Sequence, residues 1–272
     1  MKTFIALIAA LAVGLSAHGR QAIVVAHYGS SDDETRSRTI DLITADIRAA
    51  FPDTEVREAY ISPVVRRSLA KRGIETASPT DALLKLRAEG YDTVYVQSTT
   101  IIDGAEMAEV RRSVESVAPF FGYIALGRSL CYSPDDCRQV TDIMKQEACG
   151  KDEAVVYVGH GNMLPSTATY SQLDVMASTG SNGRRMVSTI EGYPTAEVTA
   201  TALERLGKGI KRVKLVPLLL VCGNHTRHDI AGEFAEVIRT AGYETEVVMR
   251  GLAENPEIRA IYVERVRQLM EE

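Results

Sequence analysis

Two histidines stand where strongly apolar segments end, and glycine accompanies both. His160 lies in the Gly-His-Gly-Asn sequence of residues 159–162, and His225 lies in the Val-Cys-Gly-Asn-His sequence of residues 221–225. Glycine lets the backbone turn sharply and lets a large ligand approach it. Neutral imidazoles bind divalent transition metals, and they also act as general bases near neutral pH. Both residues are therefore candidate metal ligands, although a single histidine in such a position can equally be structural.

Glu106 offers a carboxylate that could complete this ligand set, because it follows the glycine turn at Gly104. Two imidazoles and one carboxylate form a borderline ligand set that suits Co, Ni, Fe or Zn. The alternative for Glu106 is a place in the first turn of a helix, where the macrodipole favours an acidic side chain. His228 follows His225 by three residues and would share a helix face with it, so it either supports the site from behind or is solvated.

Several common catalytic motifs are absent from the sequence. No GxxxxGK[ST] segment occurs, and the Gly-His-Gly sequence lacks the third glycine of a dinucleotide-binding fingerprint. No GxSxG nucleophile motif is present either. We therefore expect neither a nucleotide cofactor nor acyl-transfer chemistry.

Composition places the chain among ordinary globular proteins. It has 272 residues, of which 45% are hydrophobic and 25% are charged, and its formal net charge is −5. Binding to nucleic acid or to an anionic membrane requires a basic surface, which this composition does not favour. We expect no nucleic-acid partner.

The first nineteen residues have the layout of a secretory signal peptide. Lys2 provides the positive charge, Phe4–Leu15 forms a short apolar stretch, and Ala17-His18-Gly19 places small residues at a cleavage site. The alternative is a buried first strand or helix. No second apolar segment approaches the roughly 18 residues of a membrane span. We therefore predict a periplasmic, soluble mature protein without a membrane span.

The four cysteines show no zinc-binding spacing. Cys131 and Cys137 flank a turn-like Tyr-Ser-Pro-Asp-Asp sequence, so they could close a small disulfide loop in an oxidising compartment. Buried free thiols are the alternative.

Apolar segments and amphipathic segments alternate along the whole chain. The expected strands are near-continuous Val, Ile and Leu runs, as in parallel sheets covered on both faces: 22–28, 55–61, 93–99, 123–126, 154–159, 186–190, 213–220 and 244–249. The expected helices are 32–51, 79–89, 134–148, 194–206, 226–241 and 256–270. This alternation predicts an α/β protein with parallel sheets.

The two halves of the chain resemble each other. Residues 22–29 align without a gap on 154–161, which places Tyr28 opposite His160, and residues 94–106 align on 213–225. The pattern predicts a first lobe over residues 20–150 and a second over 151–272, with a C-terminal helix that can pack back on the first lobe. Ligands of such folds bind at the carboxyl ends of the strands.

The sequence is identified as resembling the ATP-independent sirohydrochlorin cobaltochelatases of anaerobic cobalamin biosynthesis, which belong to the class II chelatases with the ferrochelatases. The motifs that carry the resemblance are Gly-His-Gly (159–161), Glu-Gly-Tyr-Pro (191–194), Val-Pro-Leu-Leu-Leu-Val-Cys-Gly-Asn-His (216–225), Asp-Ile-Ala-Gly (229–232), Ala-Tyr-Ile-Ser (59–62), Val-Gln-Ser (96–98) and Ile-Ile-Asp-Gly-Ala-Glu (101–106). They extend over essentially the whole mature chain.

The resemblance implies two flavodoxin-like lobes with a tetrapyrrole substrate in the cleft between them. It implies that His160 and His225 bind the incoming Co²⁺ and that Glu106 assists, with Fe²⁺ or Ni²⁺ as alternative metals. It also implies a homo-oligomer, and export agrees with exported members of the family. We expect His160 and Glu106 to act in catalysis.

Substrate contacts are expected in the loops that follow the first strand of each lobe. Tyr28 is the candidate for stacking on the ring, and the other candidates are Ser30, Gly161 and Asn162. Sirohydrochlorin carries eight carboxylates, so we also considered four arginines as cationic contacts, namely Arg36, Arg38, Arg184 and Arg185. A solvated charged face is the alternative for these arginines.

Four positions depart from the family's pattern. The first strand ends His27-Tyr28-Gly29-Ser30 where Phe-Gly-Thr is usual, and Thr100 stands where a histidine often precedes the Ile-Ile-x-Gly motif. Cys222 occupies the place of a small residue, where a thiolate could soften the metal site or simply pack. No clear axial ligand for haem, which some exported members bind, stands out in the sequence.

A rival function uses the same residues. A non-catalytic periplasmic carrier of a metal or a tetrapyrrole would need the same ligands and the same cleft. The predicted compartment makes this alternative serious, because the corrin ring is made in the cytoplasm.

Overall fold

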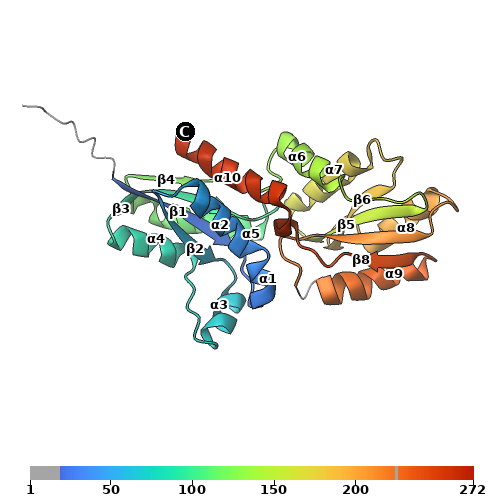
Figure 1. Cartoon of the computed structure of the whole chain (residues 1–272), viewed down its shortest axis with the longest axis horizontal. Helices are drawn as coiled ribbons and strands as arrows, with labels where there is room; N and C mark the ends of the chain where they lie inside the picture. The colour runs from blue at the N-terminus through green and yellow to red at the C-terminus, as the bar shows by residue number, and fades with distance from the viewer. Residues whose placement is uncertain (1–18, 224–225) are drawn as a thin grey trace, which may run out of the picture.

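The computed structural model describes residues 19–223 and 226–272 and contains two parallel four-stranded sheets (Figure 1). The first sheet has the order β2-β1-β3-β4 and consists of β1 (Arg20–His27), β2 (Glu55–Tyr60), β3 (Tyr91–Ser98) and β4 (Tyr123–Leu126). The second has the order β6-β5-β7-β8 and consists of β5 (Glu153–Gly161), β6 (Arg185–Glu191), β7 (Arg212–Leu218) and β8 (Glu244–Val247). The predicted α/β fold and all eight predicted strands are confirmed. We call each sheet with its helices a lobe.

The internal repeat extends to the register of the strands. In the first sheet Ala22 pairs with Val94, and in the second Ala154 pairs with Val213. The sequence alignments match Ala22 with Ala154 and Val94 with Val213, so the two strand pairs are equivalent. The two lobes therefore share strand order and strand register, so their carboxyl edges present equivalent positions.

Helices cover the sheets on both faces. Those between the strands of the first sheet and before the second are α1 (Asp33–Ser37), α2 (Ile40–Ala50), α3 (Pro63–Ala70), α4 (Pro79–Ala88), α5 (Ala105–Val117) and α6 (Pro134–Met144). The remainder are α7 (Ala168–Ser178), α8 (Ala196–Arg205), a π-helix (Thr226–Phe234), α9 (Ala235–Thr240) and α10 (Pro256–Glu271). Short 3-10 turns lie at Ala118–Phe120, Pro165–Thr167 and Leu252–Glu254.

The expected helix over residues 32–51 is two helices instead of one. The chain breaks at Thr39, whose φ of −129° and ψ of −94° are not helical. The Thr39 hydroxyl donates to backbone carbonyls of the preceding turn, which competes with the regular helical bonds. The sequence prediction also missed α3, α5 and α7.

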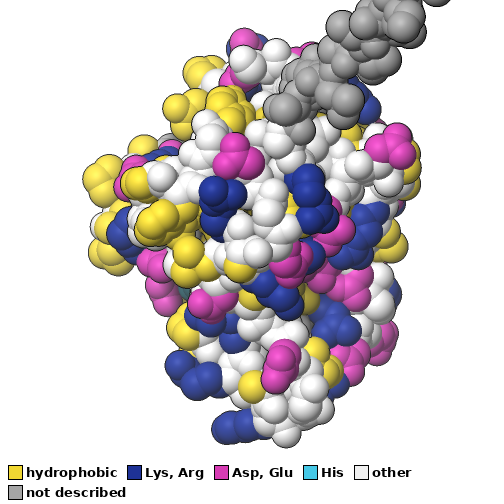
Figure 2. Space-filling view, turned by 90° about the vertical axis from the view of Figure 1, so that its left-hand side faces the viewer, with side chains coloured by type: hydrophobic (Ala, Val, Ile, Leu, Met, Phe, Trp, Pro, Cys, Tyr) yellow, Lys and Arg dark blue, Asp and Glu magenta, His cyan; other side chains and the backbone are white. Residues whose placement is uncertain are grey.

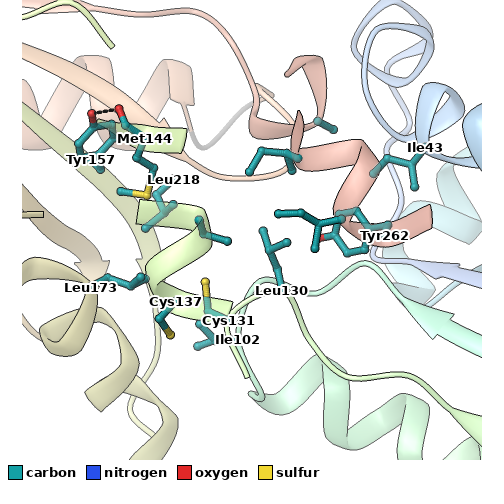
Figure 3. Close-up of a cluster of buried hydrophobic side chains, with 14 of the residues drawn as sticks. Ile43, Ile102, Leu130, Cys131, Cys137, Met144, Tyr157, Leu173, Leu218 and Tyr262 are labelled. Atoms are coloured by element: carbon teal, nitrogen blue, oxygen red, sulfur yellow. Dashed lines mark hydrogen bonds between the residues drawn. The ribbon is translucent and has the colours of Figure 1, made fainter. Parts of the chain in front are cut away.

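One apolar core runs through both lobes (Figure 3). Ile43 of α2 and Tyr262 of α10 lie on the side of the first lobe, and Leu173 and Leu218 lie on the side of the second. Leu130, on the loop after β4, lies between them. This shared core fixes how the two carboxyl edges face each other.

The last helix, α10, packs against α2 of the first lobe. Arg259 binds Asp46 at 2.6 Å, and the Tyr262 hydroxyl donates to the Thr99 carbonyl at 3.1 Å. Arg265 is 4% exposed, donates to the Leu130 carbonyl at 2.6 Å and lies 3.1 Å from Asp136. The helix therefore ties the chain's end to the loop that leads into the second lobe.

Cys131 and Cys137 are free, buried thiols, which is the second of the two alternatives for this pair. A hydrogen bond with Cys137 and burial both raise the pKa of the Cys131 thiol.

Among the residues that the structure describes, no helix has the length and apolar character needed to cross a bilayer.

Candidate functional site

A small cleft opens where the carboxyl edges of the two sheets meet. Its volume is about 180 Å³. Loops after β1, β3, β5 and β7 contribute to it, so each lobe supplies its two central strands. The lining residues are Tyr28, Gly29, Ile40, Thr99, Thr100, Ile101, Ile102, Glu106, His160, Gly161, Asn162, Tyr170, Leu218, Leu219, Leu220 and Val221.

His160 is half-buried in the cleft, at the end of β5. The glycines beside it are required by close packing. A Cβ on Gly159 would overlap the ring of Tyr170, and a Cβ on Gly161 would overlap the carbonyl oxygen of Glu191. Gly161 also has a φ of +81°, which L side chains rarely adopt. The Gly-His-Gly motif therefore places the imidazole at a strand end whose close packing leaves no room for a Cβ on either side.

Glu106 reaches the same cleft from the first lobe. It lies in the first turn of α5, where an acidic side chain interacts favourably with the helix macrodipole. Glu106 is therefore both an acidic residue in the first turn of a helix and a carboxylate that lines the cleft. A Cβ on Gly104 would lie 3.6 Å from Glu106 Oε2 and 3.4 Å from Asn162 Nδ2. The Gly104 turn thus brings the loops of the two lobes into contact.

Three of the four expected substrate contacts line the cleft. Tyr28 is 51% exposed, and Gly161 and Asn162 follow His160 directly. Asn162 Oδ1 accepts a hydrogen bond of 2.8 Å from the Leu164 amide, which orients its side chain. Ser30 lies outside the lining, where its hydroxyl accepts a hydrogen bond of 3.2 Å from the Asp32 amide.

The remaining predicted residues take different positions. His225 lies outside the described residues, so its place as a ligand stays a prediction. His228 is exposed and does not line the cleft, and Cys222 is buried with its carbonyl facing Thr35 Oγ1 at 3.5 Å. Within residues 19–223 and 226–272, no three His, Cys, Asp or Glu side chains form a metal-binding group.

The structure corrects the expectation for Arg184 and Arg185, whereas the roles of Arg36 and Arg38 as substrate contacts stay predictions. Arg184 and Arg185 stand at the amino end of β6, at the opposite edge of the sheet from His160. Arg36 lies 3.2 Å from Asp41, and Arg38 lies 3.6 Å from Glu34. Arg38 and Glu34 have the i, i+4 spacing that brings side chains together on a helix, so the sequence carried a signal for that pair.

Sequence reasoning missed two residues at the site. Tyr170 lines the cleft from α7, and its hydroxyl accepts a hydrogen bond from the Gly161 amide. Burial raises the pKa of Tyr170 to about 12, so it stays neutral. Glu191 is the last residue of β6 and pairs with Gly161, which puts a second carboxylate at this edge. The position of Glu191 before Gly192, at a predicted strand end, was a signal for it.

His27 is a structural histidine. It is fully buried, with Nδ1 3.0 Å from Thr99 Oγ1 and Nε2 2.9 Å from Thr44 Oγ1. Burial lowers its pKa to about 3, so the ring is neutral in the folded protein. Its place one residue before Tyr28 therefore serves the fold of the first lobe.

Acid should destabilise the protein through this residue. Between about pH 6.5 and 3 the unfolded chain binds a proton at His27 and the folded chain does not, so stability falls as pH falls. The slope from this group approaches about 1.4 kcal/mol per pH unit. Urea unfolding at pH 6.5, 5.5 and 4.5 measures it, and His27→Gln should lower stability at pH 7 while reducing the slope. An unchanged slope in the variant would contradict the prediction.

Comparisons with known proteins agree with this geometry. The family model described as Cobalt chelatase (CbiK) matches residues 21–271. Sirohydrochlorin cobaltochelatase of Salmonella typhimurium is 32% identical over 258 residues, which cover 92% of this chain and 97% of the relative. Sirohydrochlorin cobaltochelatase CbiKC of Nitratidesulfovibrio vulgaris is 32% identical over 249 residues, covering 86% and 85%.

Solved structures share the fold at lower identity. SirB from Bacillus subtilis with Fe3+ aligns with a TM-score of 0.66 at 14% identity, over 92% of this chain and 95% of that one. The sirohydrochlorin chelatase SirB from Bacillus subtilis subspecies spizizenii in complex with cobalt aligns with a TM-score of 0.61 at 14% identity, over 93% and 96%. At this identity the likeness establishes the two-lobed architecture alone.

Proposed function

The chain belongs to the cobalt chelatase (CbiK) family, and from this premise we propose that it inserts Co²⁺ into sirohydrochlorin without a nucleotide. The observation that carries the proposal is the placing of His160 and Glu106 from opposite lobes on one small cleft. Two relatives that are 32% identical over most of the chain are sirohydrochlorin cobaltochelatases. Fe²⁺ and Ni²⁺ are the alternative substrate metals.

The size of the cleft bears on how the substrate would bind. Pockets that enclose a drug-sized ligand have volumes of about 300–1,000 Å³. The cleft, at about 180 Å³, is smaller. We infer that the macrocycle lies across the opening with its centre toward His160, against Tyr28 on one side and Asn162 on the other. Most of its charged periphery then stays near solvent, where carboxylates are hydrated.

Insertion exchanges two pyrrole protons for one divalent cation. In the proposed reaction the neutral imidazole of His160 accepts one pyrrole proton or ligates the incoming metal, and both roles require the unprotonated ring. Each pyrrole proton that His160 does not accept leaves to solvent water at the opening of the cleft. Glu106 supplies negative charge that attracts the cation and balances the imidazolium. His225 is the proposed second imidazole. Ligation by imidazole and carboxylate leaves the metal free to move to the four ring nitrogens.

ATP-independence follows from the same chemistry. Four ring nitrogens replace a few protein ligands, so the product complex itself provides the driving force. The sequence contains no phosphate-binding loop, which agrees with this part of the proposal.

The experiment that tests the proposal separates an enzyme from a carrier. Purified protein with excess sirohydrochlorin and Co²⁺ should convert many equivalents of substrate per chain. The absorption spectrum of the metallated ring measures this conversion. Conversion of at most one equivalent per chain would favour the carrier instead. The same assay with Fe²⁺ and Ni²⁺ ranks the metals, and a run without nucleotide tests ATP-independence.

We also propose that the protein is exported and that residues 1–19 are removed. The support is the sequence itself, in which Lys2, a short apolar stretch and small residues precede Arg20. N-terminal sequencing of periplasmic material should begin at Arg20, or at His18 if cleavage follows Ala17. Soluble cytoplasmic protein that retains Met1 would contradict export.

A further inference from the structure

The helix α3 carries positive charge that the described part of the chain leaves largely unpaired. Residues 63–72 contain four cations, Arg66, Arg67, Lys71 and Arg72, and no Asp or Glu. Arg72 forms an ion pair with Asp33 and donates to the Ser31 carbonyl at 2.6 Å. Within residues 19–223 and 226–272, no ion pair involves the other three. Figure 2 shows Lys and Arg side chains at the lower end of the molecule, where Figure 1 places α3.

A hollow on this helix contains two polar atoms that lack partners. Its volume is about 490 Å³, and it is lined by Pro63, Arg66, Arg67, Ala70, Glu75 and Thr76. Arg66 Nε and Thr76 Oγ1 are both buried with no hydrogen-bond partner among the described residues. A buried polar group without a hydrogen-bond partner destabilises the folded protein. A ligand that accepts hydrogen bonds here would remove that destabilisation, and Glu75 at the border leaves a net positive charge.

The helix borders the proposed substrate cleft. The Ser62 amide, at its start, donates to the Tyr28 carbonyl at 3.1 Å. Leu69 of the helix belongs to a buried cluster against which Leu220 and Val221 of the second lobe pack. Tyr28, Leu220 and Val221 all line the cleft, so α3 forms the edge of the cleft beside β2.

We propose that the hollow on α3 binds a carboxylate side chain from the periphery of the tetrapyrrole substrate. An ionised carboxylate accepts hydrogen bonds from a guanidinium in a paired, planar geometry, and Arg66 and Arg67 both border the hollow. The Thr76 hydroxyl supplies a further donor. This inference rests on the proposed function, and it assigns to α3 the cationic contacts that Arg184 and Arg185 cannot make.

The test compares two substitutions that remove the same charge from the same helix. Arg66→Gln removes a lining guanidinium, and Lys71→Gln removes an exposed charge that does not line the hollow. We expect Arg66→Gln to raise the Kd of metal-free sirohydrochlorin by about tenfold, because the variant loses a charge-assisted hydrogen bond to the carboxylate. The fluorescence of the ring measures this binding. The KM for the ring should rise equally, with kcat and the KM for Co²⁺ unchanged. Lys71→Gln should change affinity by less than about twofold.

Two further variants keep the test independent of folding. Arg67→Gln alters an exposed side chain, and Thr76→Val removes only a hydroxyl, and both should weaken ring binding while the melting temperature stays unchanged. Equal rises in Kd for Arg66→Gln and Lys71→Gln would show that the helix attracts the ring only by its general charge, and would overturn the site. Displacement of the ring by inorganic phosphate at the same concentration in both variants would overturn it as well. Unchanged affinity in Arg66→Gln, with normal wild-type turnover, would overturn this inference alone. Wild-type protein that neither binds nor metallates the ring would overturn the proposed function as well.

Discussion

Replacing His160 with alanine should lower the rate of metal insertion at least about 100-fold and leave the protein folded, because general acid–base groups contribute about 10²–10⁴-fold. The side chain is half-buried at a strand end, and Tyr170 rather than the imidazole fills the space behind the strand. Removing the imidazole therefore takes away a ligand and a base without opening the core. The measurement is kcat/KM for sirohydrochlorin and Co²⁺, together with the melting temperature.

The matched control is His228→Ala, which removes an exposed histidine that does not line the cleft. It should keep near wild-type turnover. His225→Ala should behave like His160→Ala if the paired-ligand hypothesis is right. Near wild-type turnover of His160→Ala would show that the imidazole neither binds the metal nor accepts a proton, and Glu106 and Glu191 would then be the residues to test.

The strands and the likeness of the two lobes could be predicted from the sequence, because both follow from short repeated patterns. The Val- and Ile-rich stretch before His160 and its counterpart before Tyr28 are typical of buried parallel strands. Their gapless alignment predicts related lobes, whereas the strand order and register come from the structure. The helix α5 was missed although Met107, Val110 and Val114 are buried at helical spacing. Its buried face was visible in the sequence, whereas α7 gives a weaker signal because Thr and Ser interrupt it.

The composition of the cleft could be predicted only in part. Strand ends identify His160, Gly161 and Asn162, because the carboxyl edge of a parallel sheet is where loops converge. Tyr170 could not be found in this way, since it reaches the site from the first turn of α7 by packing on Gly159. The pairing of a cation was predictable in part: Arg36 follows Asp33 by three residues and pairs with it, whereas no acid lies within residues 63–72 around Arg66. The contact of Arg36 with Asp41 comes from the structure.

Gly161→Ala should disrupt the site more than any other single methyl group would. The residue has a φ of +81°, and its Cβ would overlap the Glu191 carbonyl oxygen, so the ends of β5 and β6 must move apart. A displacement of about 1 Å at a catalytic group can cost about 10²-fold in rate. We therefore expect kcat/KM to fall by about that factor, because His160 directly precedes Gly161 in β5.

Gly207→Ala separates backbone strain from this overlap. Gly207 has a φ of +82°, nearly the same as Gly161, but an added Cβ would meet nothing within 4 Å. The control should therefore lose only the cost of the left-handed conformation, about 1 kcal/mol or a few degrees in melting temperature, with unchanged activity. Gly161→Ala should melt at a clearly lower temperature than the control, because the overlap adds to the same strain. If the two variants melted alike and both retained full activity, the strand end would be able to move without consequence, and the close packing around His160 would have no part in the reaction.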